Sequence, residues 1–111
     1  MSILSIRDYQ QAVDDWINLV GSQYFAPTTN LCMLAEEVGE VSRLISREFG
    51  EQTYKQGERP ADVKASLADE LADVLFVVTC IANQQDIDLN AALQRNLIKK
   101  TNRDKNRYRA S

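Results

Sequence analysis

Residues 68–82, ADELADVLFVVTCIA, decide the fold of this 111-residue chain. Within residues 74–82 only Thr79 interrupts the apolar side chains, so a helix over this stretch is hydrophobic on every side. Such a helix must be covered on every side, and it is too apolar to be buried completely within so small a chain. The stretch therefore predicts a central helix that a second subunit helps to cover.

Helical periodicity continues on both sides of this stretch, and the chain shows neither an alternating strand pattern of useful length nor an internal repeat. Ser5 and Asp88 are suited to cap helices, and Gly21 and Gly50 to end them. Residues 51–62 are polar and aperiodic, which predicts a loop. The sequence thus predicts a single all-α domain over 1–111, a four-helix bundle completed by dimerisation. Its helices are expected over 5–21, from 28 or 29 to 49, from 63 or 66 to 84, and from 88 to about 100.

The composition is that of a folded protein, because 44% of the residues are hydrophobic and 26% are charged. No apolar stretch approaches the roughly 20 residues that cross a bilayer, and no secretion signal is visible, so we expect a cytoplasmic protein. Cys32 and Cys80 lie in apolar helical patterns and are expected to pack inside. The absence of histidine excludes Ser-His-Asp catalysis and histidine-bound zinc. Chemistry must use carboxylates, cations or metal ions.

The second predicted helix carries acidic residues beside its apolar face. Glu37 lies on the shoulder of the apolar arc, and Glu40 lies about 60° further round and one turn along. Glu36 points outward on the arc of Arg43 and Arg47, where a solvated ion pair explains it. The apolar arc, which we expect to face the core, consists of Leu31, Leu34, Val38, Val41 and Ile45.

The third predicted helix has a second acidic pair at the start of its apolar segment. Glu70 and Asp73 are three residues apart and share one face, whereas Asp69 points elsewhere. An unpaired carboxylate at a dry site is costly, so such groups pair with bases, take up a proton or bind a cation. If the two acidic faces pack together, they form an all-oxygen site suited to Mg²⁺ or Mn²⁺. Two solvated faces are the alternative, and the position of both pairs beside apolar arcs favours the metal site.

The strings AEEVGEVSRLI (35–45) and ADELADVLFVV (68–78) resemble the MazG-like nucleotide pyrophosphohydrolases, whose signature is Glu-Glu-x-x-Glu followed by Glu-x-x-Asp. The resemblance extends from about residue 25 to 107 and includes NQQDIDL (83–89) and TNRDKNRYR (101–109). It implies a homodimer that can pair again into a tetramer, and magnesium-dependent cleavage of ribo- or deoxyribonucleoside triphosphates to the monophosphate and pyrophosphate. It also implies metal ligands, in agreement with the helical positions: Glu37, Glu40, Glu70 and Asp73. Glu36 and Glu40 are the candidates for orienting the attacking water.

Residues 99–111 hold six basic residues and one acid, whereas the rest of the chain is acidic. Such a tail suits nucleic acid, an acidic surface or a polyphosphate, or it simply provides a soluble helix end. The acidic body and the lack of a nucleic-acid reading module argue against nucleic acid. The resemblance implies polyphosphate contacts from Lys99, Asn102, Lys105 and Arg107, and a substrate contact from Asn83, which alternatively caps the preceding helix.

The sequence specifies base recognition poorly. Trp16, Tyr24 and Phe25 can stack on a base, but Trp16 lies on the apolar face of the first predicted helix and is expected in the core. Two other functions stay open. A non-catalytic interaction module with an acidic partner-binding face would need no metal, and a ferritin-like di-iron protein is disfavoured by the absence of histidine. We expect a magnesium-dependent pyrophosphohydrolase, with Mn²⁺ as a substitute metal, that removes unwanted nucleotides from the pool.

Overall fold

The computed structural model describes residues 5–21 and 23–109, without the side chains of residues 106, 108 and 109. Within these ranges the chain is entirely helical apart from its connections, and no strand is present. α1 (Ile6–Trp16) continues into a π-helical turn (Ile17–Gly21), followed by α2 (Pro27–Phe49), α3 (Val63–Gln84) and α4 (Leu89–Arg109). The all-α prediction is confirmed.

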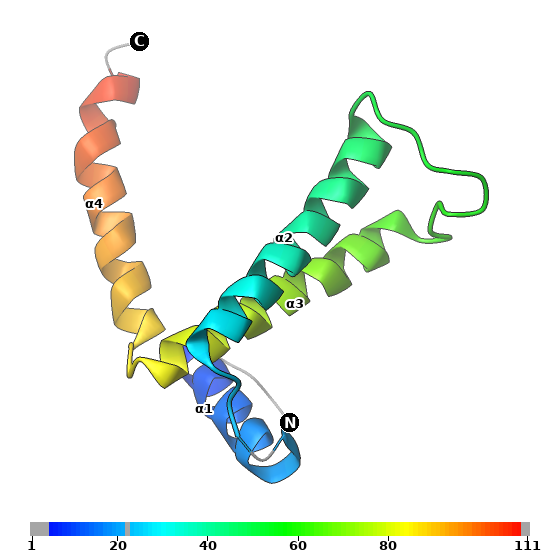
Figure 1. The fold of residues 1–111 in the computed structure, drawn as a ribbon. Coiled ribbons are helices and arrows are strands. Elements are labelled where there is room, and N and C mark those ends of the chain that lie inside the picture. The colour runs from blue at the N-terminus through cyan, green and yellow to red at the C-terminus, as the bar shows by residue number, and fades with distance from the viewer. Residues whose placement is uncertain (1–4, 22, 110–111) are drawn as a thin grey trace.

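An antiparallel hairpin of α2 and α3 dominates the molecule (Figure 1). The 50–62 loop joins the two helices at one end of the hairpin, and α1 packs against α3 at the other end. α4 contacts α1 where it begins and then projects away from the hairpin (Figure 1). The hairpin places the acidic faces of α2 and α3 opposite each other.

The helix starts follow local capping chemistry. The Ser5 hydroxyl accepts a backbone N–H of α1 at 3.1 Å, and the Asp88 carboxylate accepts one of α4 at 3.2 Å, as predicted. The Asp62 carboxylate caps α3 in the same way, because it accepts the backbone N–H of Ala65 at 3.0 Å. The expected start of α2 at residue 28 or 29 is one or two residues late, because α2 begins at Pro27, and it begins without a side-chain cap. Proline suits this first position because its φ is already helical and its missing N–H would have no helical partner.

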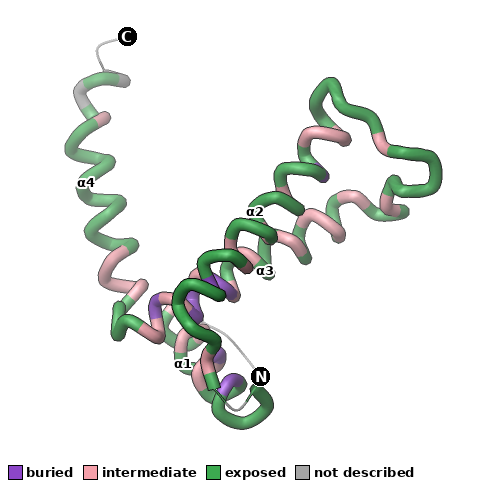
Figure 2. The backbone as a smooth tube through the Cα atoms, in the orientation of Figure 1, coloured by how far each residue is buried: buried purple, intermediate pink, exposed green. Residues whose placement is uncertain are grey.

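The core lies where α1 meets α3, and buried residues are concentrated there (Figure 2). Val13, Ile17 and Cys80 form its centre, with Tyr9, Tyr24 and Phe76 packed around them. Cys80 is buried as predicted, whereas Cys32 is exposed, so the predicted packing role of Cys32 is wrong.

The apolar arc predicted for α2 does not face this core. Leu31, Val38 and Ile45 are 60%, 49% and 42% exposed, although Leu34 and Val41 are half-buried. The apolar surface of α2 is therefore covered on the side of Leu44, which is buried, and left open on the side of Leu31, Val38 and Ile45. Leu71 and Leu75 of α3 are also about half exposed, so the apolar helix is incompletely covered by its own chain.

The predicted end of the fourth helix near residue 100 is also wrong, because α4 continues through the basic segment to Arg109. Positively charged side chains near the C-terminus of a helix interact favourably with the negative end of its dipole. The basic residues are therefore compatible with a helix that continues through them. In the described parts of the chain, no helix has the length and hydropathy that a bilayer span requires.

Candidate active site

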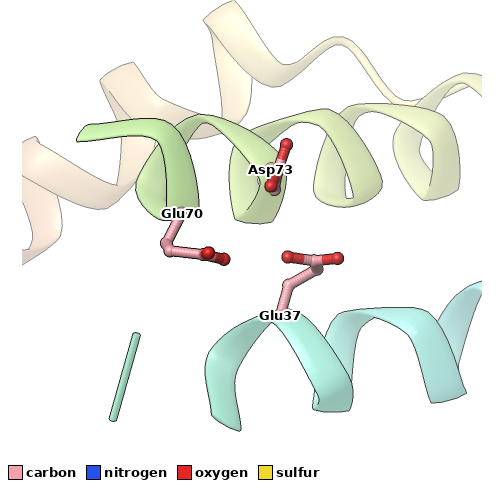
Figure 3. Close-up of side chains that lie close together, drawn as sticks. All are labelled: Glu37, Glu70 and Asp73. Carbon is pink, nitrogen blue, oxygen red and sulfur yellow. The ribbon is translucent and has the colours of Figure 1, made fainter. Parts of the chain in front are cut away.

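Three carboxylates meet between α2 and α3 (Figure 3). Glu37 points from α2 toward α3, and Glu70 and Asp73 point from α3 toward Glu37. One carboxylate oxygen from each residue lies within 4.8 Å of the other two. The hairpin thus brings together three of the four predicted metal ligands, as their helical positions led us to expect. We call these three residues the acidic cluster.

No lysine or arginine of the described residues forms an ion pair with the acidic cluster. Glu37 and Glu70 are half-buried and Asp73 is exposed. Desolvation raises the pKa of Glu37, and the carboxylates of Asp73 and Glu70 raise this pKa further. A divalent cation would relieve the repulsion, and oxygen ligands of this kind are those that Mg²⁺ and Mn²⁺ prefer. The residues fit such a metal.

Glu40, the fourth predicted ligand, lies one turn further along α2 and outside the acidic cluster. Its carboxylate lies 3.9 Å from the Arg43 guanidinium. Glu40 lines a groove on the loop side together with Glu70, and an outer groove together with Glu36 and Glu37. Glu36 is exposed, and Arg43 pairs with Glu40 instead of with Glu36.

The groove on the loop side of the acidic cluster has a volume of about 320 Å³. Arg43 and Arg47 of α2 line it, together with Tyr54 of the loop and Ser66 and Glu70 of α3. Sequence analysis assigned the two arginines to a solvated surface and missed this groove. The available signal was their spacing, because residues three and seven positions after Glu40 lie on the same side of a helix.

An apolar cavity of about 260 Å³ lies on the other side of the acidic cluster, between α1, α2 and α3. Trp16 and Phe76 line it and pack edge to face, with 5.7 Å between ring centroids. Because Trp16 is 49% exposed, its predicted place in the core is wrong. Met33 and Phe76 are one helical turn from Glu37 and Asp73, so the cavity adjoins the acidic cluster.

Comparison with known proteins places this arrangement in a family. Residues 25–108 match the MazG nucleotide pyrophosphohydrolase domain. This chain belongs to the MazG family. It is 39% identical over 108 residues to YpjD of Bacillus subtilis (strain 168). The aligned region covers 97% of this chain and 94% of YpjD.

Solved structures of the MazG family share the fold. The crystal structure of YpjD from Bacillus subtilis is similar with a TM-score of 0.74 and 35% identity, over 89% of this chain and 97% of that chain. The crystal structure of the Bacillus-conserved MazG protein, a nucleotide pyrophosphohydrolase, gives a TM-score of 0.70 and 33% identity, over 89% and 92% of the two chains. The MazG resemblance read from the sequence is confirmed, and the chain is a nucleotide pyrophosphohydrolase.

Asn83, a predicted substrate contact, is engaged within the fold. Its amide donates to the Gln10 carbonyl at 3.0 Å and to the Tyr24 hydroxyl at 3.1 Å, and it accepts from the Gln10 side chain at 2.9 Å. The Tyr24 hydroxyl donates to Asp14 at 2.6 Å. Burial, followed by this hydrogen bond, raises the pKa of Tyr24 to about 12, so the hydroxyl keeps its proton. These bonds join α1 to the end of α3, and the substrate role of Asn83 stays a prediction.

The predicted phosphate contacts of the tail lie on α4, away from the α2–α3 hairpin (Figure 1). Lys99, Asn102, Lys105 and Arg107 are all exposed. The Arg107 guanidinium lies 4.0 Å from the Asp104 carboxylate. Within one chain, α4 does not carry these side chains to the acidic cluster, and their role stays a prediction.

Proposed function

We propose that this MazG protein hydrolyses ribo- or deoxyribonucleoside triphosphates to the monophosphate and pyrophosphate with the help of Mg²⁺. The observation that carries the proposal is the meeting of Glu37, Glu70 and Asp73 within 4.8 Å, with no ion pair to a lysine or arginine among the described residues. These three residues would hold the metal, and Glu40 would complete the set from the next turn of α2. Mn²⁺, which accepts the same ligands, would substitute.

A bound Mg²⁺ would supply positive charge to phosphate oxygens and lower the pKa of a coordinated water. In the reaction, a water oxygen forms a bond to the α-phosphorus, and the bond between that phosphorus and the bridging oxygen breaks. Pyrophosphate leaves with the bridging oxygen and its electron pair, and the water gives up one proton. Glu40 and Glu36 are proposed to orient the water, because both line the outer groove beside Glu37.

The functional molecule is proposed to be a homodimer, with pairing of dimers as a further step. Support comes from apolar residues that this chain leaves uncovered on α2 and α3, such as Leu31 and Leu75, which are 60% and 57% exposed. In such an assembly, α4 of one subunit is proposed to bring Lys99, Lys105 and Arg107 to the acidic cluster of the other. The biological role we propose is removal of unwanted nucleotides from the pool.

Product analysis is the direct test. Each triphosphate in a panel should give one monophosphate and one pyrophosphate per turnover in the presence of Mg²⁺, and chelation should abolish turnover. The same panel ranks the bases and the two sugars. Release of orthophosphate with accumulation of the diphosphate would contradict the proposal.

The alternative of a non-catalytic interaction module with an acidic partner-binding face is wrong, because the chain is a MazG nucleotide pyrophosphohydrolase. The proposed metal site has its own test in thermal melting, because a protein that binds Mg²⁺ gains stability as the Mg²⁺ concentration rises. An identical melting temperature with Mg²⁺ and with chelator would contradict the proposed metal site.

A further inference from the structure

Arg43 is placed between the two polar grooves that flank the acidic cluster. It lines the outer groove with Glu36 and Glu37, and it lines the loop-side groove with Arg47 and Glu70. Its side chain is 58% exposed, and its guanidinium is held only by the 3.9 Å pair with Glu40 among the described residues. An ion pair at this distance and exposure is weak, so an anion that binds the guanidinium more strongly can displace the Glu40 carboxylate.

The loop side of the groove is held in place by ion pairs that leave Arg43 available. The Arg47 guanidinium pairs with Glu58 at 3.3 Å, and this arginine side chain is only 21% exposed. Arg59 makes two hydrogen bonds to the Glu48 carboxylate, at 2.8 and 3.3 Å. These contacts fasten the 50–62 loop to α2. The groove is therefore formed before a ligand arrives, with Arg43 as its accessible cation.

Charge and shape give the two sides of the acidic cluster different ligand preferences. The cavity on the α1 side has apolar walls that include Trp16 and Phe76, which suit a nucleoside better than a phosphate. The groove on the loop side is lined by Arg43 and Arg47 as well as by the carboxylates of Glu40, Glu58 and Glu70. Its guanidinium groups have a planar fork that matches phosphate oxygens, and a Mg²⁺ held by Glu40 and Glu70 would offset their negative charge. A triphosphate whose α-phosphate lies at the acidic cluster would therefore extend its β- and γ-phosphates toward the loop.

We propose that Arg43 binds the β- and γ-phosphates and stabilises the pyrophosphate as it leaves, an inference that rests on the proposed function. When the bond between the α-phosphorus and the bridging oxygen breaks, negative charge moves onto the pyrophosphate. The three carboxylates of the acidic cluster would already offset much of the charge of a bound divalent cation, so positive charge from outside the cluster favours this step. A guanidinium next to the leaving group attracts it more strongly as that negative charge grows. An attraction that is stronger in the transition state than in the bound substrate lowers the reaction barrier.

The test compares Arg43→Gln with Arg95→Gln, which removes the same charge from an exposed position on α4. Arg43→Gln should lower kcat/KM by about ten- to a hundredfold and weaken inhibition by magnesium pyrophosphate by about tenfold or more. Inhibition by the nucleoside monophosphate should change by less than about twofold, because that product lacks the phosphates that Arg43 contacts. Arg43→Lys should recover part of the loss, and Arg95→Gln should behave like the unaltered protein.

Two outcomes would overturn the role of Arg43. One is pyrophosphate inhibition of Arg43→Gln equal to that of Arg95→Gln. The other is an equal loss of inhibition by both products together with loss of the Mg²⁺-dependent rise in melting temperature, which would mean that Arg43 only supports the acidic cluster. Calorimetric binding of magnesium pyrophosphate to the unaltered protein and to Arg43→Gln needs no turnover. It tests Arg43 even if product analysis rejects the proposed reaction.

Discussion

At the scale of single residues, Glu37 combines a cost to folding with a proposed role in metal binding. Three carboxylates within 4.8 Å repel one another, and the raised pKa of Glu37 reflects desolvation and this repulsion. Glu37→Gln should therefore raise the melting temperature of the metal-free protein at neutral pH, abolish the rise caused by Mg²⁺ and lower activity about a hundredfold or more. Calorimetric melting with Mg²⁺ and with chelator, together with initial rates, checks all three effects.

Asp69→Asn is the matched control for the acidic cluster. Asp69 is exposed and adjacent in sequence to Glu70, but it is not a member of the cluster. It should leave activity and the response to Mg²⁺ close to those of the unaltered protein. Asp73→Asn, by contrast, should act like Glu37→Gln. Equal damage from the two aspartate variants would show that the assignment of the α3 face is wrong.

Asn83 tests whether a polar side chain at a helix end serves the fold or the substrate. Its amide bonds to Gln10 and Tyr24, so Asn83→Ala leaves partly buried partners unsatisfied between α1 and α3. Losing such bonds costs about 1–3 kcal/mol, and we expect a lower melting temperature with little change in KM. A higher KM at an unchanged melting temperature would instead restore the predicted substrate contact. Thermal melting and steady-state kinetics on the same preparation separate the two.

At the scale of helices, the start of α4 depends on one carboxylate. The Asp88 side chain caps the helix and lies 3.3 Å from the Arg7 guanidinium. The backbone hydrogen bond from Ala91, followed by Arg7, lowers the pKa of Asp88 below its ordinary value of 3.8. Its contribution to stability is therefore complete above that value and is lost as the pH falls through the lowered pKa of the folded state.

Asp88→Ala should accordingly lower the melting temperature at neutral pH, because it removes the cap and the contact with Arg7. The difference from the unaltered protein should shrink as the pH falls below about 3.8. Melting curves of both proteins across this range measure the effect. A difference that stays constant down to the lowest pH would mean that the ionised carboxylate contributes nothing.

Helical spacing predicted the site better than it predicted the packing of the helices. Glu37, Glu70 and Asp73 could be placed together because periodicity fixes which side chains share a face. The exposed Leu31 and Val38 could not be foreseen, because the same periodicity cannot tell an apolar face that packs within the chain from one left uncovered. Arg43 was missed because the groove depends on how the 50–62 loop folds back, and that segment has no periodic signal.

At the scale of the whole molecule, the uncovered arc of α2 predicts association. Ile45 belongs to that arc and is 42% exposed, whereas Leu19 lies in the π-helical turn after α1 and is 86% exposed. If the arc is a subunit interface, Ile45→Lys should lower the molecular mass in solution, because it buries an unpaired charge there. Leu19→Lys should not change the mass. Sedimentation at several concentrations checks this, and a mass unaffected by Ile45→Lys would exclude the arc as the interface.

The end of α4 provides the last test, because α4 projects away from the α2–α3 hairpin that carries the acidic cluster (Figure 1). If the tail binds the triphosphate of a neighbouring subunit, deletion of residues 105–111 should raise KM clearly. The melting temperature should change little, since an exposed helix end adds little to a core. The effect should be largest at low salt, because screening weakens exposed charge interactions at high ionic strength. An unchanged KM with a large fall in melting temperature and in molecular mass would assign the end of α4 to subunit packing. If KM rises instead, the deletion and Arg43→Gln separate two sources of positive charge for one polyphosphate: a groove within each chain and a helix from its neighbour.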